Sequence, residues 1–141
     1  MRWRRLGWAG IEREAGGETL VIEIEGPEVT PVLPAAVEVA AYRIATEAVT
    51  NVVQHAGASR CVVSLSMNGA LEVAVSDNGT RPWDPTRIGV GWASMRERAA
   101  ELGGTCTVAR RSEGGTLVRA VLPLTTSIRV GDRADATVPA P

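Results

Sequence analysis

The sequence contains no lysine, and the residues with a permanent positive charge are its 15 arginines. A Walker P-loop uses a lysine to reach the nucleotide phosphates, so this class of site is excluded. Phosphate would have to be held by backbone N–H groups, a metal ion or arginine. The 2 cysteines and 1 histidine also fall short of the four ligands of a structural zinc site. Cys61 and Cys106 lie in apolar, strand-like stretches and are predicted to be reduced core residues.

Long apolar runs are missing as well. None approaches the roughly 20 residues of a membrane-spanning helix, and no signal-peptide pattern opens the chain. We therefore expect a cytoplasmic domain with no direct membrane contact, whose parent protein could still be membrane-anchored through another segment. A formal net charge of −1 disfavours a nucleic-acid partner, and 45% hydrophobic residues are enough to bury one core.

Periodicity divides the chain into a leader, one domain and a tail. Residues 1–18 are predicted to be an irregular leader or linker, residues 19–124 the domain, and residues 125–141 a disordered tail. The expected strands are 19–25, 61–67, 71–76, 105–110 and 116–123, and the expected helices run from Pro34 to His55 and from about Gly89 to Leu102. Asn68-Gly69 predicts a hairpin turn. The fold class is an α/β (α+β) two-layer sandwich, with a mixed β-sheet and helices on one face.

Three polar residues, Glu47, Asn51 and His55, are spaced four apart and would form a column on one helix face. An apolar stripe runs beside the column and should face the core; it comprises Val37, Ala41, Ile44, Ala48 and Val52. Magnesium takes oxygen ligands and keeps several waters, so the Asn51 amide is a candidate ligand. Glu47 alone is more simply part of a solvated face, although it could orient or deprotonate an acceptor.

A second polar motif, Asp77-Asn78-Gly79, follows the alternating strand at 71–76, and parity places Asp77 on the core face. A buried carboxylate needs a donor, and an adenine exocyclic amine is one. Gly79 would let the backbone approach the ring closely. The same tripeptide is also an ordinary turn signal, which by itself is the simpler interpretation.

A third motif, Gly89-Val90-Gly91, is predicted to open the helix that Gly103-Gly104 closes. Free N–H groups at a glycine-rich helix N-terminus can bind phosphate. Position 94 is serine, so the Gly-x-Gly-x-x-Gly fingerprint of dinucleotide sites fails. The aperiodic stretch Thr80–Ile88 suits either a lid over bound nucleotide or a static loop.

The order of these motifs, completed by Gly114-Gly115-Thr116, resembles the Bergerat-type ATP-binding fold shared by gyrase, heat-shock chaperones, mismatch-repair ATPases and histidine kinases. Within that superfamily, Glu47–Ala56 and Gly91–Gly104 resemble the catalytic domain of bacterial sensor histidine kinases that signal to regulators of the nitrate-response (NarL) type. The resemblance covers about residues 19–124, and Met95-Arg-Glu-Arg98 is specific to this branch.

The resemblance implies ATP and magnesium as cofactors. Asp77 would read adenine, with Gly79 beside the ring and Thr116 supporting the pocket. Asn51 would bind magnesium, and His55 would contribute to the ATP site.

On the phosphate side, Gly89 and Gly91 would flank the phosphates beneath a mobile lid, and Glu47 would be the polarising base. The chain departs from the family pattern at two polar positions. Arg81 stands where a second glycine is expected, and Gln54 where a basic residue is frequent, which removes one candidate phosphate contact.

One apolar position, Trp92, also departs from the pattern, which usually has leucine there, and is read as a larger core residue. A complete histidine kinase needs an acceptor histidine on a dimerising helix pair, but His55 lies inside the expected magnesium-binding helix. The expected function is therefore that of a catalytic domain. It would transfer the ATP γ-phosphoryl group to a histidine on the parent kinase's dimerisation segment, which serves a response regulator. The alternatives are an anti-sigma-factor serine kinase of the same fold and a non-catalytic ATP-binding interaction module.

Overall fold

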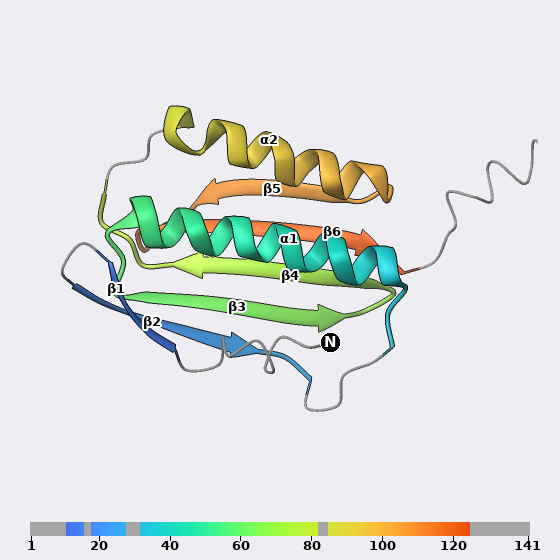
Figure 1. The fold of residues 1–141 in the computed structure, drawn as a ribbon, viewed down its shortest axis with the longest axis horizontal. Helices are drawn as coiled ribbons and strands as arrows, with labels where there is room; N and C mark the ends of the chain where they lie inside the picture. The colour runs from blue at the N-terminus through green and yellow to red at the C-terminus, as the bar shows by residue number, and fades with distance from the viewer. Residues whose placement is uncertain (1–10, 16–17, 28–31, 82–84, 125–141) are drawn as a thin grey trace, which may run out of the picture.

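One mixed sheet forms the back of the molecule. The computed structural model describes residues 11–15, 18–27, 32–81 and 85–124, and within them the strand order is β1-β2-β3-β4-β6-β5 (Figure 1). The strands are β1 (Ile11–Ala15), β2 (Glu18–Glu25), β3 (Arg60–Met67), β4 (Ala70–Asp77), β5 (Thr105–Arg110) and β6 (Thr116–Pro123). Among them, β2 pairs with β3 in parallel, and the other neighbouring pairs are antiparallel.

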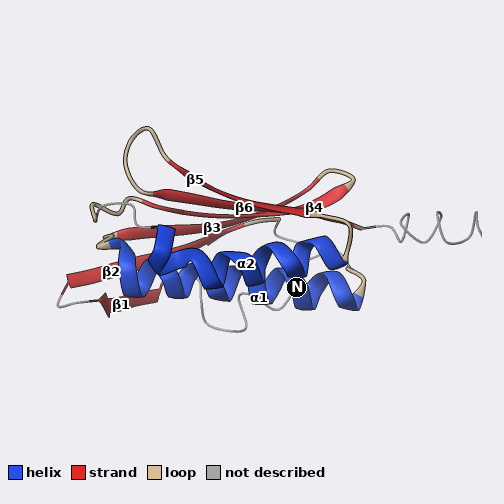
Figure 2. Ribbon diagram, turned by 90° about the horizontal axis from the view of Figure 1, so that it is seen from above, coloured by secondary structure: helices blue, strands red, loops and turns tan. Residues whose placement is uncertain are grey.

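Two helices cover the same face of this sheet, α1 (Ala35–Asn51) and α2 (Pro85–Glu101) (Figure 2). Pro34 is the N-cap of α1, and a π-helical turn, η2 (Val52–Ala56), extends its C-terminal end. Gly57 follows in the left-handed conformation, at φ 60°, which glycine adopts without steric cost. The predicted two-layer sandwich with helices on one face is confirmed.

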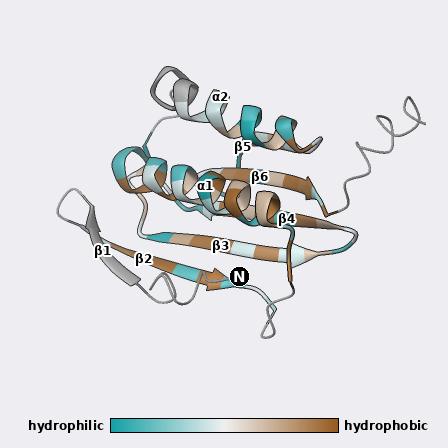
Figure 3. Cartoon of the chain, turned by 45° about the vertical axis from the view of Figure 1, so that its right-hand side comes forward, coloured by the Kyte–Doolittle hydropathy of each residue, from teal (hydrophilic) through white to brown (hydrophobic). Residues whose placement is uncertain are grey.

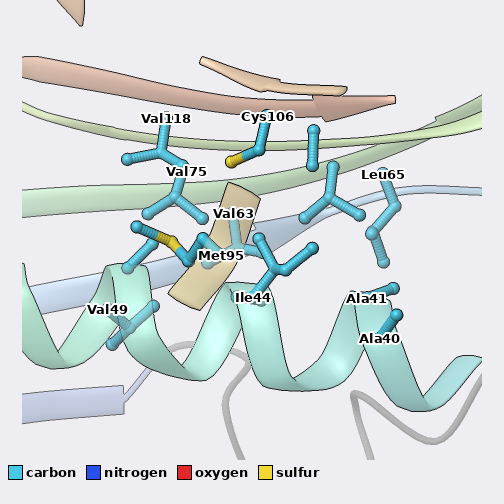
Figure 4. Packing of buried hydrophobic residues seen from close by; sticks show 14 of the residues in the cluster. Ala40, Ala41, Ile44, Val49, Val63, Leu65, Val75, Met95, Cys106 and Val118 are labelled. Carbon is cyan, nitrogen blue, oxygen red and sulfur yellow. The ribbon is translucent and has the colours of Figure 1, made fainter. Parts of the chain in front are cut away.

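The core lies between the helices and the sheet. Alternation along the strands, visible in Figure 3 for β2 and β3, buries one set of side chains and exposes the other. All members of the stripe predicted on the first helix are buried, and Figure 4 shows Ile44 facing the strands. Met95 of α2 joins the same cluster. Small residues such as Ala41 and Ala48 bring α1 close to the sheet.

The opposite sheet face is polar. It carries two exposed ion pairs, Arg60 with Glu23 at 3.0 Å and Arg119 with Glu72 at 2.7 Å. In each pair the hydrogen bond that arginine donates lowers the pKa of the glutamate. Exposed pairs of this kind contribute little to stability. This face is therefore a solvated surface, and the buried polar chemistry lies on the helix side.

The N-terminal boundary differs from the prediction. Ile11–Ala15 form β1 rather than an irregular leader, because the backbone edge of β2 offers hydrogen bonds that a five-residue strand can use. Residues 1–10 and the predicted tail, 125–141, lie outside the described residues, so the domain limits stay a prediction. No helix within the described ranges is both long and apolar enough to cross a membrane.

The start of α2 is a second difference. The helix begins at Pro85, so residues 85–88 are helical rather than part of an aperiodic lid, and 82–84 fall outside the described residues. The prediction that Gly89 and Gly91 open the helix is wrong. Proline suits the first helical turn, and the preceding Asp84 is a typical capping residue in the sequence, a signal that was available.

Several local predictions are confirmed. The β3–β4 hairpin turns at Asn68-Gly69, where Gly69 has φ 74°. The strands predicted at 105–110 and 116–123 have those bounds. Both cysteines are free and buried, and burial raises the pKa of the Cys61 thiol to about 12, with the Asp77 charge as a smaller cause.

Candidate functional site

A pocket of about 420 Å³ opens between the helix layer and one end of the sheet. Its floor comes from β4, β6 and β5, and its walls from the C-terminal part of α1, from η2 and from α2. Five of the predicted site residues line it together: Asn51, His55, Asp77, Gly79 and Thr116. Sequence positions from three separate motifs therefore meet in one cavity.

Asp77 is the buried charge of this pocket. Its residue is only 3% exposed, and one carboxylate oxygen accepts a hydrogen bond from the Gly79 N–H at 2.7 Å. Burial raises the pKa of Asp77, while hydrogen bonds from the backbones of Gly79 and Thr116 and the charge of Arg111 act in the opposite direction. The parity prediction, which placed this side chain on the core face, is confirmed. The carboxylate is held in place and still lines the open cavity.

The raised pKa of Asp77 predicts how the stability of the fold depends on pH. An acid whose folded-state pKa lies above its unfolded value favours folding when protonated, and this contribution is lost as pH rises through the folded pKa. Asp77→Asn, which keeps an oxygen for the Gly79 N–H, should therefore raise the Tm by a few degrees at pH 7. The difference should shrink on acidification and vanish once Asp77 is protonated in both the folded and the unfolded chain. Thermal melts of the variant and the unaltered chain at pH 7 and at acidic pH measure this difference in Tm. A lower Tm for the variant at pH 7 would contradict the prediction.

Two glycines allow the rim of the pocket to close around Asp77. A side-chain carbon at Gly115, which has φ 90°, would overlap the Asp77 carbonyl oxygen, and one at Gly79 would overlap the Ala56 carbonyl oxygen. Arg111 strengthens this rim, because its Nη1 donates to the Asp77 carbonyl at 2.7 Å. Sequence reasoning missed Arg111, and its only signal was its place beside the Gly114-Gly115 turn.

Asn51 and His55 form the helical wall. The π-helical turn η2 begins directly after Asn51, and π turns recur at functional sites. Within the described residues, no group of three or more His, Cys, Asp or Glu could hold a metal by itself. Magnesium, however, is usually held by one or two protein oxygens together with phosphates and water. The Asn51 amide beside a pocket that could admit phosphates fits that donor set.

Glu47, one turn earlier in the predicted column, is not among the pocket-lining residues. Its carboxylate packs against Gly91 of α2, where an added side-chain carbon would overlap Oε1. Gly91 therefore gives Glu47 the room that it occupies. Gly89 is the fifth residue of α2, and helical N–H groups beyond the first four are bonded within the helix.

Trp92 and Met95 of α2 also line the pocket. The Arg96 guanidinium lies 5.1 Å from the Trp92 ring centre. The buried Trp92 indole N–H has no hydrogen-bond partner among the described residues. The tryptophan predicted to be a core residue is thus half-buried at the edge of the cavity, packed against the core.

Residues 36–126 match the protein family described as "Histidine kinase-, DNA gyrase B-, and HSP90-like ATPase". Over 120 residues the chain is 37% identical to the sensor histidine kinase MctS of Rhizobium johnstonii, covering 81% of this chain and 26% of that protein. It is 41% identical over 93 residues to the nitrate/nitrite sensor protein NarQ of Escherichia coli, covering 63% of this chain and 16% of NarQ. The chain thus spans about a quarter or less of these relatives.

Two solved structures share the fold. The histidine kinase domain of a blue-light activated kinase from Erythrobacter litoralis aligns with a TM-score of 0.61 and 26% identity, over 73% of this chain and 51% of that one. The ATP binding domain of PrrB from Mycobacterium tuberculosis aligns with a TM-score of 0.55 and 24% identity, over 75% and 81%.

Proposed function

The chain belongs to the family of histidine kinase-, DNA gyrase B- and HSP90-like ATPases, and we propose that it is the ATP-binding catalytic domain of a sensor histidine kinase. The observation that carries the proposal is the buried Asp77 carboxylate, which lines the pocket. This carboxylate suits an adenine exocyclic amine, since one of its oxygens accepts a hydrogen bond from the Gly79 N–H and acceptor capacity remains. Gly79 and Thr116 would border the ring.

The phosphates would extend toward the helical wall. Asn51 would hold magnesium there, and His55 would border the nucleotide. When bound, magnesium neutralises phosphate charge. The protein's own contribution is then to orient the nucleotide and to keep water from the reacting phosphoryl group.

The reaction we propose is phosphoryl transfer to a histidine on the dimerisation segment of the parent kinase. An imidazole nitrogen of that histidine attacks the γ-phosphorus, the bond to the β,γ-bridging oxygen breaks, and ADP leaves. Glu47 would accept the proton that the imidazole loses. The phosphorylated histidine would then serve a cognate response regulator. The curated relatives named above are sensor kinases, which favours this function over an anti-sigma serine kinase.

Asp77→Asn should weaken ATP binding by about tenfold or more, because a charge-assisted hydrogen bond contributes about 1.5–3 kcal/mol. Titration calorimetry with ATP and magnesium measures the change. Glu97→Gln, which alters an exposed carboxylate outside the pocket, is the matched control. Since Asp77→Asn is expected to stabilise the fold at pH 7, weaker binding would not be a result of unfolding. Unchanged affinity would refute the adenine assignment.

The product identifies the reaction. With radiolabelled ATP, the chain alone should gain almost no label, and adding its native dimerisation segment should restore labelling. A phosphoramidate on histidine is lost in acid and survives base, whereas a phosphoserine ester is stable to acid. Acid-stable label on a separate small protein would favour the serine kinase. ATP binding without transfer to any acceptor would leave a nucleotide-binding interaction module.

A further inference from the structure

Arg81 lies on the pocket rim beside the end of η2. Its backbone N–H donates to the Ala56 carbonyl at 3.1 Å, and its guanidinium Nη1 donates to the Gln54 carbonyl at 3.4 Å. The side chain passes over Gly57 on its way there. The neighbouring Thr80 hydroxyl donates to the Gly57 carbonyl, also at 3.4 Å. Residues 79–81 are therefore fastened to the C-terminal end of the helical wall.

This end of the wall is unfavourable for an anion unless a cation lies beside it. The last carbonyls of a helix carry partial negative charge. Residue 54, on the same turn, is a neutral glutamine. Among the described residues that line the pocket, the arginines are Arg81 and Arg110, and Arg110 belongs to β5, away from the helical wall. Arg81 is the arginine on the side of Asn51 and His55.

The guanidinium of Arg81 has donors to spare. Arginine has five N–H groups, and the single bond to Gln54 is long for a hydrogen bond. The residue is exposed, so its side chain is free to turn toward a ligand at little cost. Two parallel N–H groups of a guanidinium match two phosphate oxygens.

We propose that Arg81 binds the nucleotide phosphates and thereby supplies, from the rim loop, the cationic contact that position 54 lacks. The inference rests on the proposed function, because it needs a nucleotide in this pocket. This role gives a physical reason for arginine at position 81. A glycine there would leave the helical wall of Asn51 and His55 without a cation.

The test compares ATP, ADP and adenosine by titration calorimetry in Arg81→Gln, Arg81→Lys and the unaltered chain. Arg81→Gln should weaken ATP and ADP binding by about tenfold, the loss of one charged contact, while adenosine affinity stays within about twofold. Arg81→Lys should recover part of the loss, because lysine binds phosphate as a point charge. Arg43→Gln makes the same charge change at an exposed α1 position outside the pocket and should leave all three affinities unchanged.

The outcomes separate this inference from the function on which it rests. Equal losses for ATP, ADP and adenosine would show that Arg81 only fastens the loop, which would overturn the inference, as would unchanged affinities. If the unaltered chain binds none of the three, the proposed function fails and the inference fails with it. Adenosine binding by the variant also confirms that its pocket has folded.

Discussion

Glu47→Gln should slow phosphoryl transfer to histidine by about 10²–10⁴-fold, the usual contribution of a general base, and leave ATP affinity nearly unchanged. Glutamine has the shape of glutamate, so its packing against Gly91 should persist while the proton acceptor is lost. Single-turnover transfer to the separate dimerisation segment measures the rate, and calorimetry measures the affinity. Equal losses of binding and transfer would make Glu47 a structural residue.

A companion variant tests the position of the carboxylate rather than its charge. Gly91→Ala adds a methyl group where Oε1 of Glu47 lies, so it should displace this carboxylate and, if Glu47 is the base we propose, slow transfer. In a helix interior alanine is favoured over glycine by about 1 kcal/mol, so the variant should not melt at a lower temperature. Slower transfer with an undiminished Tm is a result that a general loss of stability would not give. Unchanged transfer would mean that Glu47 can act from another position.

Gly115→Ala should be the most destabilising of these changes, lowering the free energy of unfolding by about 3 kcal/mol. Two costs combine, since φ of 90° is strained for alanine and the new carbon overlaps the Asp77 carbonyl oxygen. A loss of this size changes the folding equilibrium more than a hundredfold, roughly tenfold for each 1.4 kcal/mol. Urea unfolding measures it. ATP binding should also weaken, because the displaced backbone carries Asp77, which we propose binds adenine.

Gly69 provides the control. It has φ 74°, but an added carbon there would meet nothing within 4 Å. Gly69→Ala therefore carries the backbone cost alone, about 1 kcal/mol. If Gly115→Ala lowers the free energy of unfolding no more than Gly69→Ala does, the close approach of Gly115 to Asp77 contributes nothing to stability.

Patterns between residues close in the sequence predicted which side chains of the strands and of α1 are buried. Period-two alternation placed Val75 and Asp77 on the buried face, and helical periodicity identified the buried stripe of α1. The motif order indicated the ATPase family to which the chain belongs and the sensor-kinase resemblance that the comparisons bear out.

Two other features of the structure could not be predicted, because each depends on a partner distant in the sequence. Gly91 of α2 lies against Glu47 of α1, a contact that the pattern of neither helix indicates. Arg111 reaches the Asp77 carbonyl across 34 residues of sequence. Periodicity within one element carries no information on such pairings.

The parallel pairing of β2 with β3 has a consequence for the order of folding. The hairpins β3–β4 and β5–β6 close short loops, whereas β2 and β3 are joined by a long crossover that contains α1. Closing a longer loop costs more entropy before its contacts form, so local hairpins should assemble first and β2 should be added late. Asn51 and His55 lie within that crossover. Docking of α1 on the face of the sheet would thus accompany the pairing of β2 with β3 and build the wall of the pocket in a single event, and a partly unfolded state that releases α1 would take the pocket apart as well.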